Sequence, residues 1–178
     1  MRNPIASLFF ALPILAQTPS TGDALATFDK FALNYANLHK QIERSLSPMK
    51  PGTDRAKIAS QHDALVVGLL AARKSAVAGE IFTPAVSTEI RRILKEAMSG
   101  AAATRITKSL KRSEPSQFKL RINDEFPPAL PLQTMPSTIL SKLPKLPTEL
   151  DYRIVGRSLV LRDTKANLIV DFLLEALP

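Results

Sequence analysis

"IVGRSLVLRDTKANLIVDF", residues 154–172, carries the pattern that decides the fold class of this 178-residue chain. Gly156 and Arg157 suit the two central positions of a tight β-hairpin turn, because glycine readily adopts the positive backbone angle needed at the first of them. The pairs that this turn predicts are Val155 with Ser158, Ile154 with Leu159, Tyr152 with Leu161, and Asp151 with Arg162. This register sorts apolar from polar side chains almost completely, which is typical of a half-buried hairpin.

The rest of the quoted stretch predicts a third strand. A four-residue loop, 163–166, would return the chain and place Leu168, Val170 and Phe172 on the apolar face of the hairpin. Asp163 is expected to shape this turn, as aspartate often does. The segment therefore predicts a three-stranded antiparallel meander that covers a helical layer.

The first half of the chain has helical periodicity instead. Apolar residues recur at helical spacing over 23–47, and they are Phe28, Phe31, Tyr35, Leu38, Ile42 and Leu46. After the breaker "SPMKPGTD", a second run extends from Ile58 to Val77 and ends at Gly79. These two segments predict an antiparallel helical hairpin. Thr83 and Pro84 suit the N-cap and first turn of a third helix, which is expected to end near Ser99.

Residues 126–147 contain six prolines, which exclude a long helix or an internal strand. Because apolar residues are frequent between the prolines, this segment is expected to be extended chain packed on the helices, with a short helix in "PSTILSKL". The predicted fold is therefore α+β. The predicted divisions are a signal peptide at 1–16, a helical region at 17–113, and the proline-rich segment and meander at 114–178, packed with the helices as one domain.

The start of the chain predicts export. Arg2 precedes a twelve-residue, mostly apolar run from Ile5 to Ala16, and polar residues follow from Gln17. A positive charge, an apolar run of about 7–15 residues and a small residue at the cut are typical of a secretory signal. We expect a mature chain that begins near Gln17, is periplasmic or secreted, and has no transmembrane helix. The alternative is a buried N-terminal helix, although the prolines in this stretch argue against one.

Composition limits the chemistry of the protein. The chain has no cysteine, which excludes disulfides, thiol catalysis and cysteine metal sites. The formal charge is +8, which favours anionic partners. Glycine-rich phosphate loops, nucleophile elbows and His-Glu-x-x-His motifs are absent from the sequence. We therefore predict no catalytic residue, no metal ligand and no cofactor.

Two histidines offer the alternative of an enzyme. His39 and His62 lie nearly symmetrically about the predicted turn between the first two helices, with Glu43 and Asp63 nearby. An antiparallel hairpin would bring the imidazoles to a similar height, where they could serve acid–base chemistry or bind a metal. The competing interpretation is structural: His62 falls on the apolar stripe as a packed core residue, and His39 lies at its boundary.

Positive charge is concentrated between residues 91 and 121. This basic segment holds nine lysines and arginines against two glutamates, a surplus of +7. The candidate binding residues are Arg91, Arg92, Lys95, Arg105, Lys108, Lys111 and Arg112. The segment predicts contact with an anionic lipid, a glycan or an acidic protein; a solvated helix face followed by a connector is the alternative. Nucleic acid is disfavoured, since Phe118 is the only aromatic residue available for base stacking.

Two stretches of the chain resemble a family of exported bacterial proteins without an assigned activity. They are "GEIFTPAV", residues 79–86, and the ending "LPKLPTELDYRIVGRSLVLRDTKANLIVDFLLEALP". The resemblance spans roughly residues 25–178 and implies a periplasmic or secreted protein of bacterial origin. It implies no catalytic residue.

Together these features predict an exported, non-catalytic envelope protein that binds or scaffolds. The alternative is a hydrolase-like periplasmic enzyme that uses His39, His62 and nearby carboxylates. The oligomeric state is not predicted.

Overall fold

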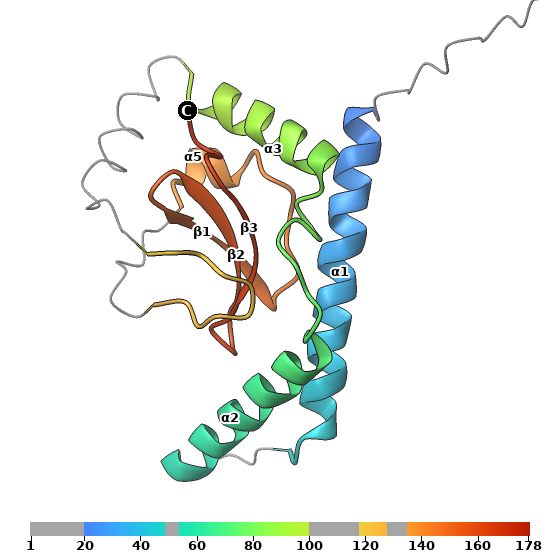
Figure 1. Cartoon of the computed structure of the whole chain (residues 1–178), viewed down its shortest axis with the longest axis vertical. Coiled ribbons are helices and arrows are strands. Elements are labelled where there is room, and N and C mark those ends of the chain that lie inside the picture. Colours follow the sequence, from blue (N-terminus) through green and yellow to red (C-terminus); the bar gives the residue numbers. More distant parts are fainter. Residues whose placement is uncertain (1–19, 49–53, 100–117, 128–134) are drawn as a thin grey trace, which may run out of the picture.

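The computed structural model describes residues 20–48, 54–99, 118–127 and 135–178. Its elements, in chain order, are α1 (Thr21–Ser45), α2 (Arg55–Ala72), α3 (Pro84–Ala97), α5 (Ser137–Leu140), β1 (Leu150–Val155), β2 (Ser158–Asp163) and β3 (Ile169–Leu173). Helices followed by a C-terminal antiparallel sheet confirm the α+β class. Figure 1 shows α1 along one side of the molecule, α3 across the top of the sheet, and α2 projecting away near the lower end of α1. The predicted signal peptide lies outside the described residues.

Each long helix begins at a residue that caps it. Ser20 and Asp23 form a reciprocal capping box at the start of α1. The carboxylate of Asp54 accepts the Lys57 N–H at 2.8 Å at the start of α2. Thr83 caps α3, and Pro84 occupies its first turn, as the sequence predicts. These caps satisfy backbone N–H groups that have no partner inside the helix.

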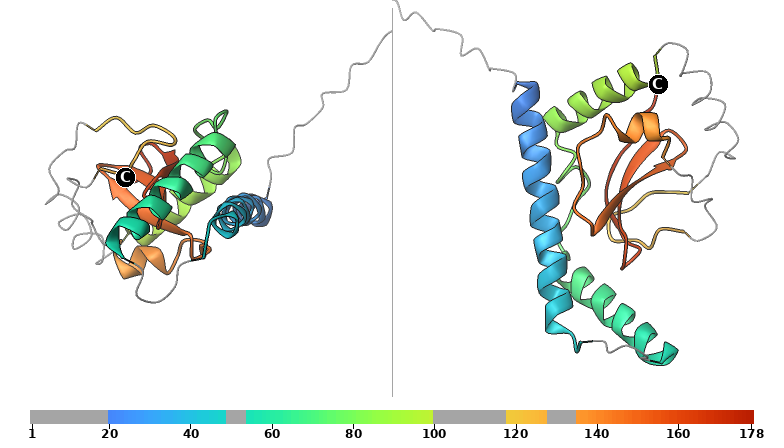
Figure 2. Two further views of the ribbon diagram at one scale, coloured as in Figure 1. Left: turned by 90° about the horizontal axis from the view of Figure 1, so that it is seen from below. Right: turned by 180° about the vertical axis from the view of Figure 1, so that it is seen from behind.

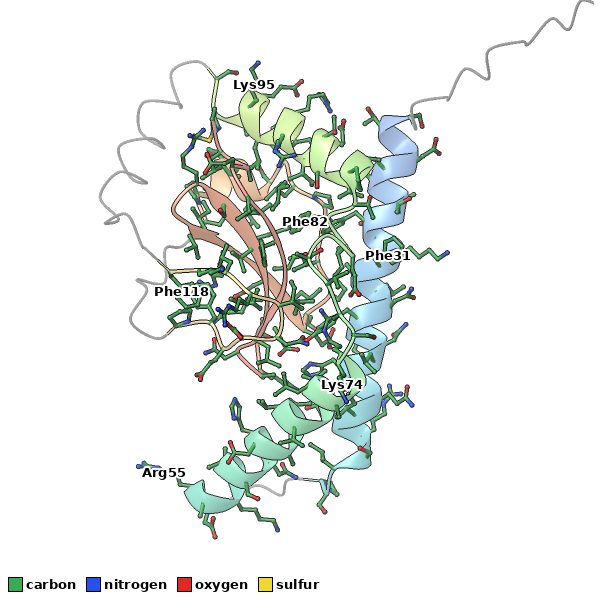
Figure 3. The ribbon with its side chains drawn as sticks, in the orientation of Figure 1. Phe31, Arg55, Lys74, Phe82, Lys95 and Phe118 are labelled. Atoms are coloured by element: carbon green, nitrogen blue, oxygen red, sulfur yellow. The ribbon has the colours of Figure 1, made fainter. Side chains whose placement is uncertain are left out.

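The buried face of α1 differs from the predicted stripe. Phe28 and Tyr35 are buried as expected, but Phe31 is exposed, and Ala32 and His39 are buried instead. These buried positions follow the 3.6-residue period of the helix, so the true stripe is rotated toward small residues. The small alanine side chain on this face lets neighbouring segments of the protein approach α1 closely. Figure 3 shows Phe82 between α1 and the sheet, where its ring lies 5.9 Å from that of Phe28.

The predicted second helix is too long at its C-terminus. α2 ends at Ala72, and only Leu65 and Leu69 are buried along it. The two helices are in close contact where Gly68 meets Ile42, because a Cβ at residue 68 would lie 2.6 Å from the Ile42 Cγ2. Figures 1 and 2 show that the two helices converge near this end of α2 and splay apart toward its N-terminus. The exposed lower part of α2 therefore lies beside a groove rather than against α1.

α2 ends just before Arg73, whose side chain and backbone make contacts outside the helix. Its guanidinium donates to the Asn123 Oδ1 at 3.1 Å and to the Val170 carbonyl at 2.8 Å. The Asn123 amide in turn donates to the Arg73 carbonyl at 2.9 Å. Because the Arg73 carbonyl and side chain are both engaged outside the helix, the chain turns here, and residues 73–82 form the connection to α3.

The sheet has the order β1-β2-β3, with both pairs antiparallel. The register of β1 and β2 is the predicted one at every pair named above. The hairpin turn is also confirmed, since Gly156 has a φ of +60°. The apolar face of the hairpin joins the main core against the helices, where Leu159 and Leu161 are completely buried.

The third strand departs from the prediction at one residue. A bulge opposite Leu161 and Arg162 shifts the register, so that Asp171, rather than Phe172, turns toward the main core. Leu168 and Val170 lie in that core as expected. Phe172 instead joins a second, smaller core on the opposite face of the sheet.

That opposite face is covered, although the sequence pattern predicts a largely polar surface there. Val155, Val160 and Ile169 are buried on it, and Phe126 packs against them. Residues 118–127 cross this face and hydrogen-bond to β3, through the Asn123 N–H to the Ile169 carbonyl at 2.9 Å. The sheet therefore lies between two apolar layers.

The described part of the proline-rich segment packs as predicted. Residues 128–134 of it lie outside the described residues. The short helix is α5, and Met135, Ile139 and Leu143 are buried in the main core.

Candidate functional site

Asp163, the last residue of β2, is the centre of a completely buried polar cluster. Its Oδ2 accepts the Tyr35 hydroxyl at 2.7 Å and lies 2.5 Å from the His39 Nδ1. Its Oδ1 accepts the backbone N–H groups of Lys165 at 2.9 Å and Ala166 at 2.7 Å. The last two contacts confirm that Asp163 shapes the turn after β2. The contacts with α1 tie the sheet to that helix.

The cluster keeps this carboxyl ionised. Burial raises the pKa of Asp163, but the hydrogen bonds from His39, the Ala166 N–H and Tyr35 outweigh burial and hold that pKa below its ordinary value. Burial and the charge of Asp163 together raise the pKa of the Tyr35 hydroxyl far above its ordinary value. Tyr35 therefore donates a proton to the hydrogen bond and does not lose it. Arg73 stacks over the Tyr35 ring, 5.1 Å from its centroid.

The position of His39 reverses the predicted roles of the two histidines. His39 is completely buried, whereas the His62 side chain is 47% exposed and its Nδ1 lies 3.5 Å from the Asp63 Oδ1. Since a carboxylate can only accept, the His39 Nδ1 carries the proton shared with Asp163. The His39 Nε2 is buried and has no hydrogen-bond partner among the described residues. It lies 3.7 Å from the Glu43 Oε2, which is beyond hydrogen-bond distance.

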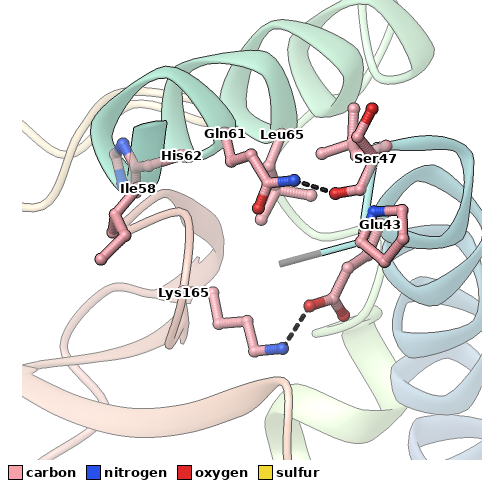
Figure 4. A pocket seen from close by; sticks show the side chains of 9 residues that line it. Glu43, Ser47, Ile58, Gln61, His62, Leu65 and Lys165 are labelled. Carbon is pink, nitrogen blue, oxygen red and sulfur yellow. Dashed lines mark hydrogen bonds and ion pairs between the residues drawn. The ribbon is translucent and has the colours of Figure 1, made fainter. Parts of the chain in front are cut away.

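Glu43 connects this buried cluster to a surface groove of about 510 Å³. The groove lies between the C-terminal end of α1, the N-terminal part of α2 and the turn after β2, and we call it the α1–α2 groove. Its apolar lining consists of Leu46, Pro48, Ile58 and Leu65. Its polar lining consists of Glu43, Ser47, Gln61, His62 and Lys165. Figure 4 shows these side chains converging on one open space.

Two polar contacts shape the α1–α2 groove. The Lys165 Nζ lies 2.5 Å from the Glu43 Oε1 and joins the turn after β2 to α1. The Gln61 amide donates to the Ser47 carbonyl and joins α2 to the end of α1. Both contacts are dashed in Figure 4. Among the described residues, the groove thus combines apolar walls with polar groups that include the Glu43–Lys165 ion pair, a composition usual for a small-molecule site.

The structure does not bring His39 and His62 into one cleft. His62 lines the α1–α2 groove, while His39 lies beneath Glu43 and outside that lining. The sequence signal for the true cluster is the spacing of Tyr35, His39 and Glu43. These residues are four apart and so share one face of α1. Their partner Asp163 could not be identified from spacing, since it is 124 residues from His39.

A second buried carboxylate, Asp171, holds the connection between α2 and α3. Its oxygens accept the backbone N–H groups of Gly79, Ile81, Phe82 and Phe172, each at 2.8 Å. Gly79 has a φ of +88°, a conformation that favours glycine. Residues 79–82, "GEIF", are therefore hydrogen-bonded to Asp171 in β3. The two stretches on which the resemblance rests are thus in contact in the folded protein. These four contacts give Asp171 a structural role.

The predicted basic site is only partly described. Arg91 donates to the Leu174 carbonyl at 3.0 Å and, weakly, to the Glu175 carbonyl. Arg92 pairs with Glu89 and Glu96 on its own helix. Lys95 is exposed. The other four candidates, Arg105, Lys108, Lys111 and Arg112, lie outside the described residues.

No helix in the described ranges is long and apolar enough to cross a membrane. No group of three or more histidine, aspartate or glutamate side chains there could hold a metal ion.

The resemblance to exported bacterial proteins stays a prediction. No protein family model, no curated protein and no solved structure matches this chain.

Proposed function

We propose that this protein is a non-catalytic binding protein and that the α1–α2 groove holds its ligand. The groove itself carries the proposal. It has a volume of about 510 Å³, an apolar lining and the Glu43–Lys165 ion pair at its edge. Ligand sites in proteins typically have volumes of roughly 300–1,000 Å³ and combine apolar walls with a few polar groups.

The buried cluster favours binding over catalysis. A general base must come within hydrogen-bond reach of its substrate. His39 is completely buried, and all the hydrogen-bonding positions of Asp163 are filled by protein groups. His62 has only Asp63 as a charged neighbour within 4 Å among the described residues. These observations support the view that the cluster fastens α1 to the sheet and gives the groove a rigid wall.

The binding test uses a neutral apolar fluorophore, N-phenyl-1-naphthylamine, whose emission rises in an apolar site. We expect saturable enhancement with the wild-type protein. The Ile58→Asp variant should lose it, because Ile58 lines the groove. Val77→Asp is the matched control, since Val77 is an exposed aliphatic residue outside the groove. Equal enhancement by Ile58→Asp and wild type, with both variants folded by circular dichroism, would overturn the proposal.

We also propose that the protein acts outside the cytoplasm, in the periplasm or after secretion. What supports this is the pattern of residues 1–17, a positive charge followed by an apolar run and a small residue. N-terminal sequencing of the protein recovered from the cell envelope or medium tests it. A first residue near Gln17 is expected; an intact Met1 in the cytoplasmic fraction would contradict it.

A second candidate function is contact with an anionic surface through the basic segment. Of the 24 lysines and arginines, 18 lie among the described residues, together with 15 of the 16 aspartates and glutamates. The described part therefore carries only +3 of the formal +8. Four of the remaining basic residues lie between 105 and 112, so the surplus is concentrated in the basic segment.

A further inference from the structure

We infer that the ligand of the α1–α2 groove is an amphipathic anion, an apolar chain ending in a carboxylate; this rests on the binding function proposed above. The inference starts from Glu43, which lies between two possible partners. Its Oε1 is 2.5 Å from the Lys165 Nζ, and its Oε2 is 3.7 Å from the His39 Nε2. The first contact is a close ion pair, and the second is longer than a hydrogen bond.

The second partner is unsatisfied. The His39 Nε2 has no hydrogen-bond partner among the described residues and is fully buried. Nδ1 donates to Asp163, so Nε2 is the ring nitrogen left without a partner among the described residues. The Glu43 Oε2 lies 3.7 Å from it, beyond hydrogen-bond distance. A proton on Nε2 would convert this unpaired contact into a charge-assisted hydrogen bond.

The binding of an anionic head group would change both contacts of Glu43, the one with Lys165 and the one with His39. When a ligand carboxylate takes the Lys165 ammonium, Glu43 is released toward His39. The Nε2 then binds one proton from solvent, and the imidazolium lies between Glu43 and Asp163. Every charge remains paired: the ligand with Lys165, and His39 with both protein carboxylates. A cationic head would take Glu43 from Lys165 and leave the Nε2 unpaired, and a neutral head would change neither contact.

The charged groups nearest His39 come from two elements. Glu43 approaches the imidazole from α1, and Asp163, which also accepts the Tyr35 hydroxyl, approaches it from β2. Lys165, in the turn after β2, reaches it only through Glu43. Arg73, at the end of α2, lies over the Tyr35 ring, 5.1 Å from its centroid. The two carboxylates are therefore the nearest charges to the imidazole.

Three probes with the same eight-carbon chain test the ligand class: octanoate, octylammonium and octanol, titrated by calorimetry at pH 7. We expect octanoate to bind about tenfold more tightly than octanol, the gain typical of a charge-assisted contact. Lys165→Met should bring octanoate within about twofold of octanol. Lys30→Met is the matched control and should keep the preference, because Lys30 is an exposed lysine of α1 outside the groove.

The outcomes separate the two proposals. If none of the three probes binds at millimolar concentration, the groove is not a ligand site and the proposed function fails. If octanol or octylammonium binds as tightly as octanoate, the groove stands and the anionic ligand class is overturned. The same conclusion follows if Lys165→Met retains the full preference for octanoate.

Proton uptake tests the role of Glu43 and His39. Octanoate titrations in two buffers that differ in ionisation enthalpy should show uptake of up to one proton by the wild-type protein. The Glu43→Gln variant should show none, because its amide carries no charge to balance the imidazolium. It should also bind octanoate about two- to fivefold more tightly, since the amide no longer competes for Lys165. Absence of proton uptake by the wild type would overturn this exchange.

Discussion

The Nδ1 of His39 lies 2.5 Å from the Oδ2 of Asp163, and both side chains are completely buried. This contact joins the C-terminal half of α1 to the end of β2, and the Tyr35 hydroxyl strengthens it by donating to the same oxygen at 2.7 Å. Because breaking a buried charged network leaves uncompensated groups in the core, the contact should matter greatly for stability.

Replacement of Asp163 by asparagine should destabilise the protein by about 2–4 kcal/mol. The asparagine amide has about the same size as the aspartate carboxylate. Its NH₂ group cannot accept a hydrogen bond, however, so two of the four groups that now donate to Asp163 would lose their acceptor. Asp63→Asn is the matched control, because Asp63 is an exposed aspartate, and a change of at most about 0.5 kcal/mol is expected there. Urea unfolding followed by circular dichroism measures both. Equal unfolding midpoints for the two variants would show that the cluster contributes little.

The lowered pKa of Asp163 predicts that the folded protein loses stability in acid. The pKa of Asp163 is lower in the folded protein than its ordinary value of 3.8, so the unfolded chain binds more protons than the folded chain in this range. The stabilisation from Asp163 should therefore be complete above about pH 5 and decrease as the pH falls through 3.8 toward the lower folded pKa. The difference in the free energy of unfolding between wild type and Asp163→Asn should shrink as the pH falls from about 5 through 3.8. Parallel curves would contradict this origin of the stability.

Asp171 should protect the backbone of the connection between α2 and α3. It accepts the N–H groups of Gly79, Ile81 and Phe82, each at 2.8 Å. In Asp171→Asn, hydrogen exchange at these amides should become at least about tenfold faster, while amides in the middle of α1 change less. Amide exchange detected by NMR is the measurement. Unchanged protection of these three amides would mean that packing alone holds the connection.

The basic segment predicts salt-sensitive binding to anionic membranes. Wild-type protein should sediment with vesicles of anionic lipid at low salt and be released at about 0.5 M salt, because exposed charges are screened. Replacing the four residues Arg105, Lys108, Lys111 and Arg112 with glutamine should abolish this retention. A control variant with glutamine at Lys57 and Lys74, which are basic residues outside the segment, should remain bound. Full retention of the fourfold variant would eliminate the segment as the binding region.

The hairpin could be predicted from sequence because its information is local. Gly156 sets the turn, and alternating apolar residues then fix one register. The bulge in β3 could not be predicted in this way. It brings Asp171 to the main core, where the N–H groups of residues 79–82 require an acceptor, and so turns Phe172 to the other face. The requirement comes from a segment about 90 residues away.

The wrong predictions of which helix residues are buried have the same cause. Periodicity alone gave Phe31 and His62 as inward residues, but the buried positions are determined by what packs against each helix. His39 is buried because Asp163 supplies its hydrogen-bond partner, a long-range contact without a local signal. The α1–α2 groove was missed for a similar reason, since Lys165 reaches Glu43 across 122 residues of sequence.

NMR chemical-shift mapping with octanoate tests the account most directly. We predict saturable shifts concentrated in the amides of residues 43–48, 58–65 and 165, which line or adjoin the α1–α2 groove, with little change in α3 or β1. The His39 side-chain Nε2 signal should move at the same time toward the position of a protonated nitrogen. No shift at saturating octanoate, or shifts centred on the described residues of another surface, would contradict the assignment of this groove as the ligand site.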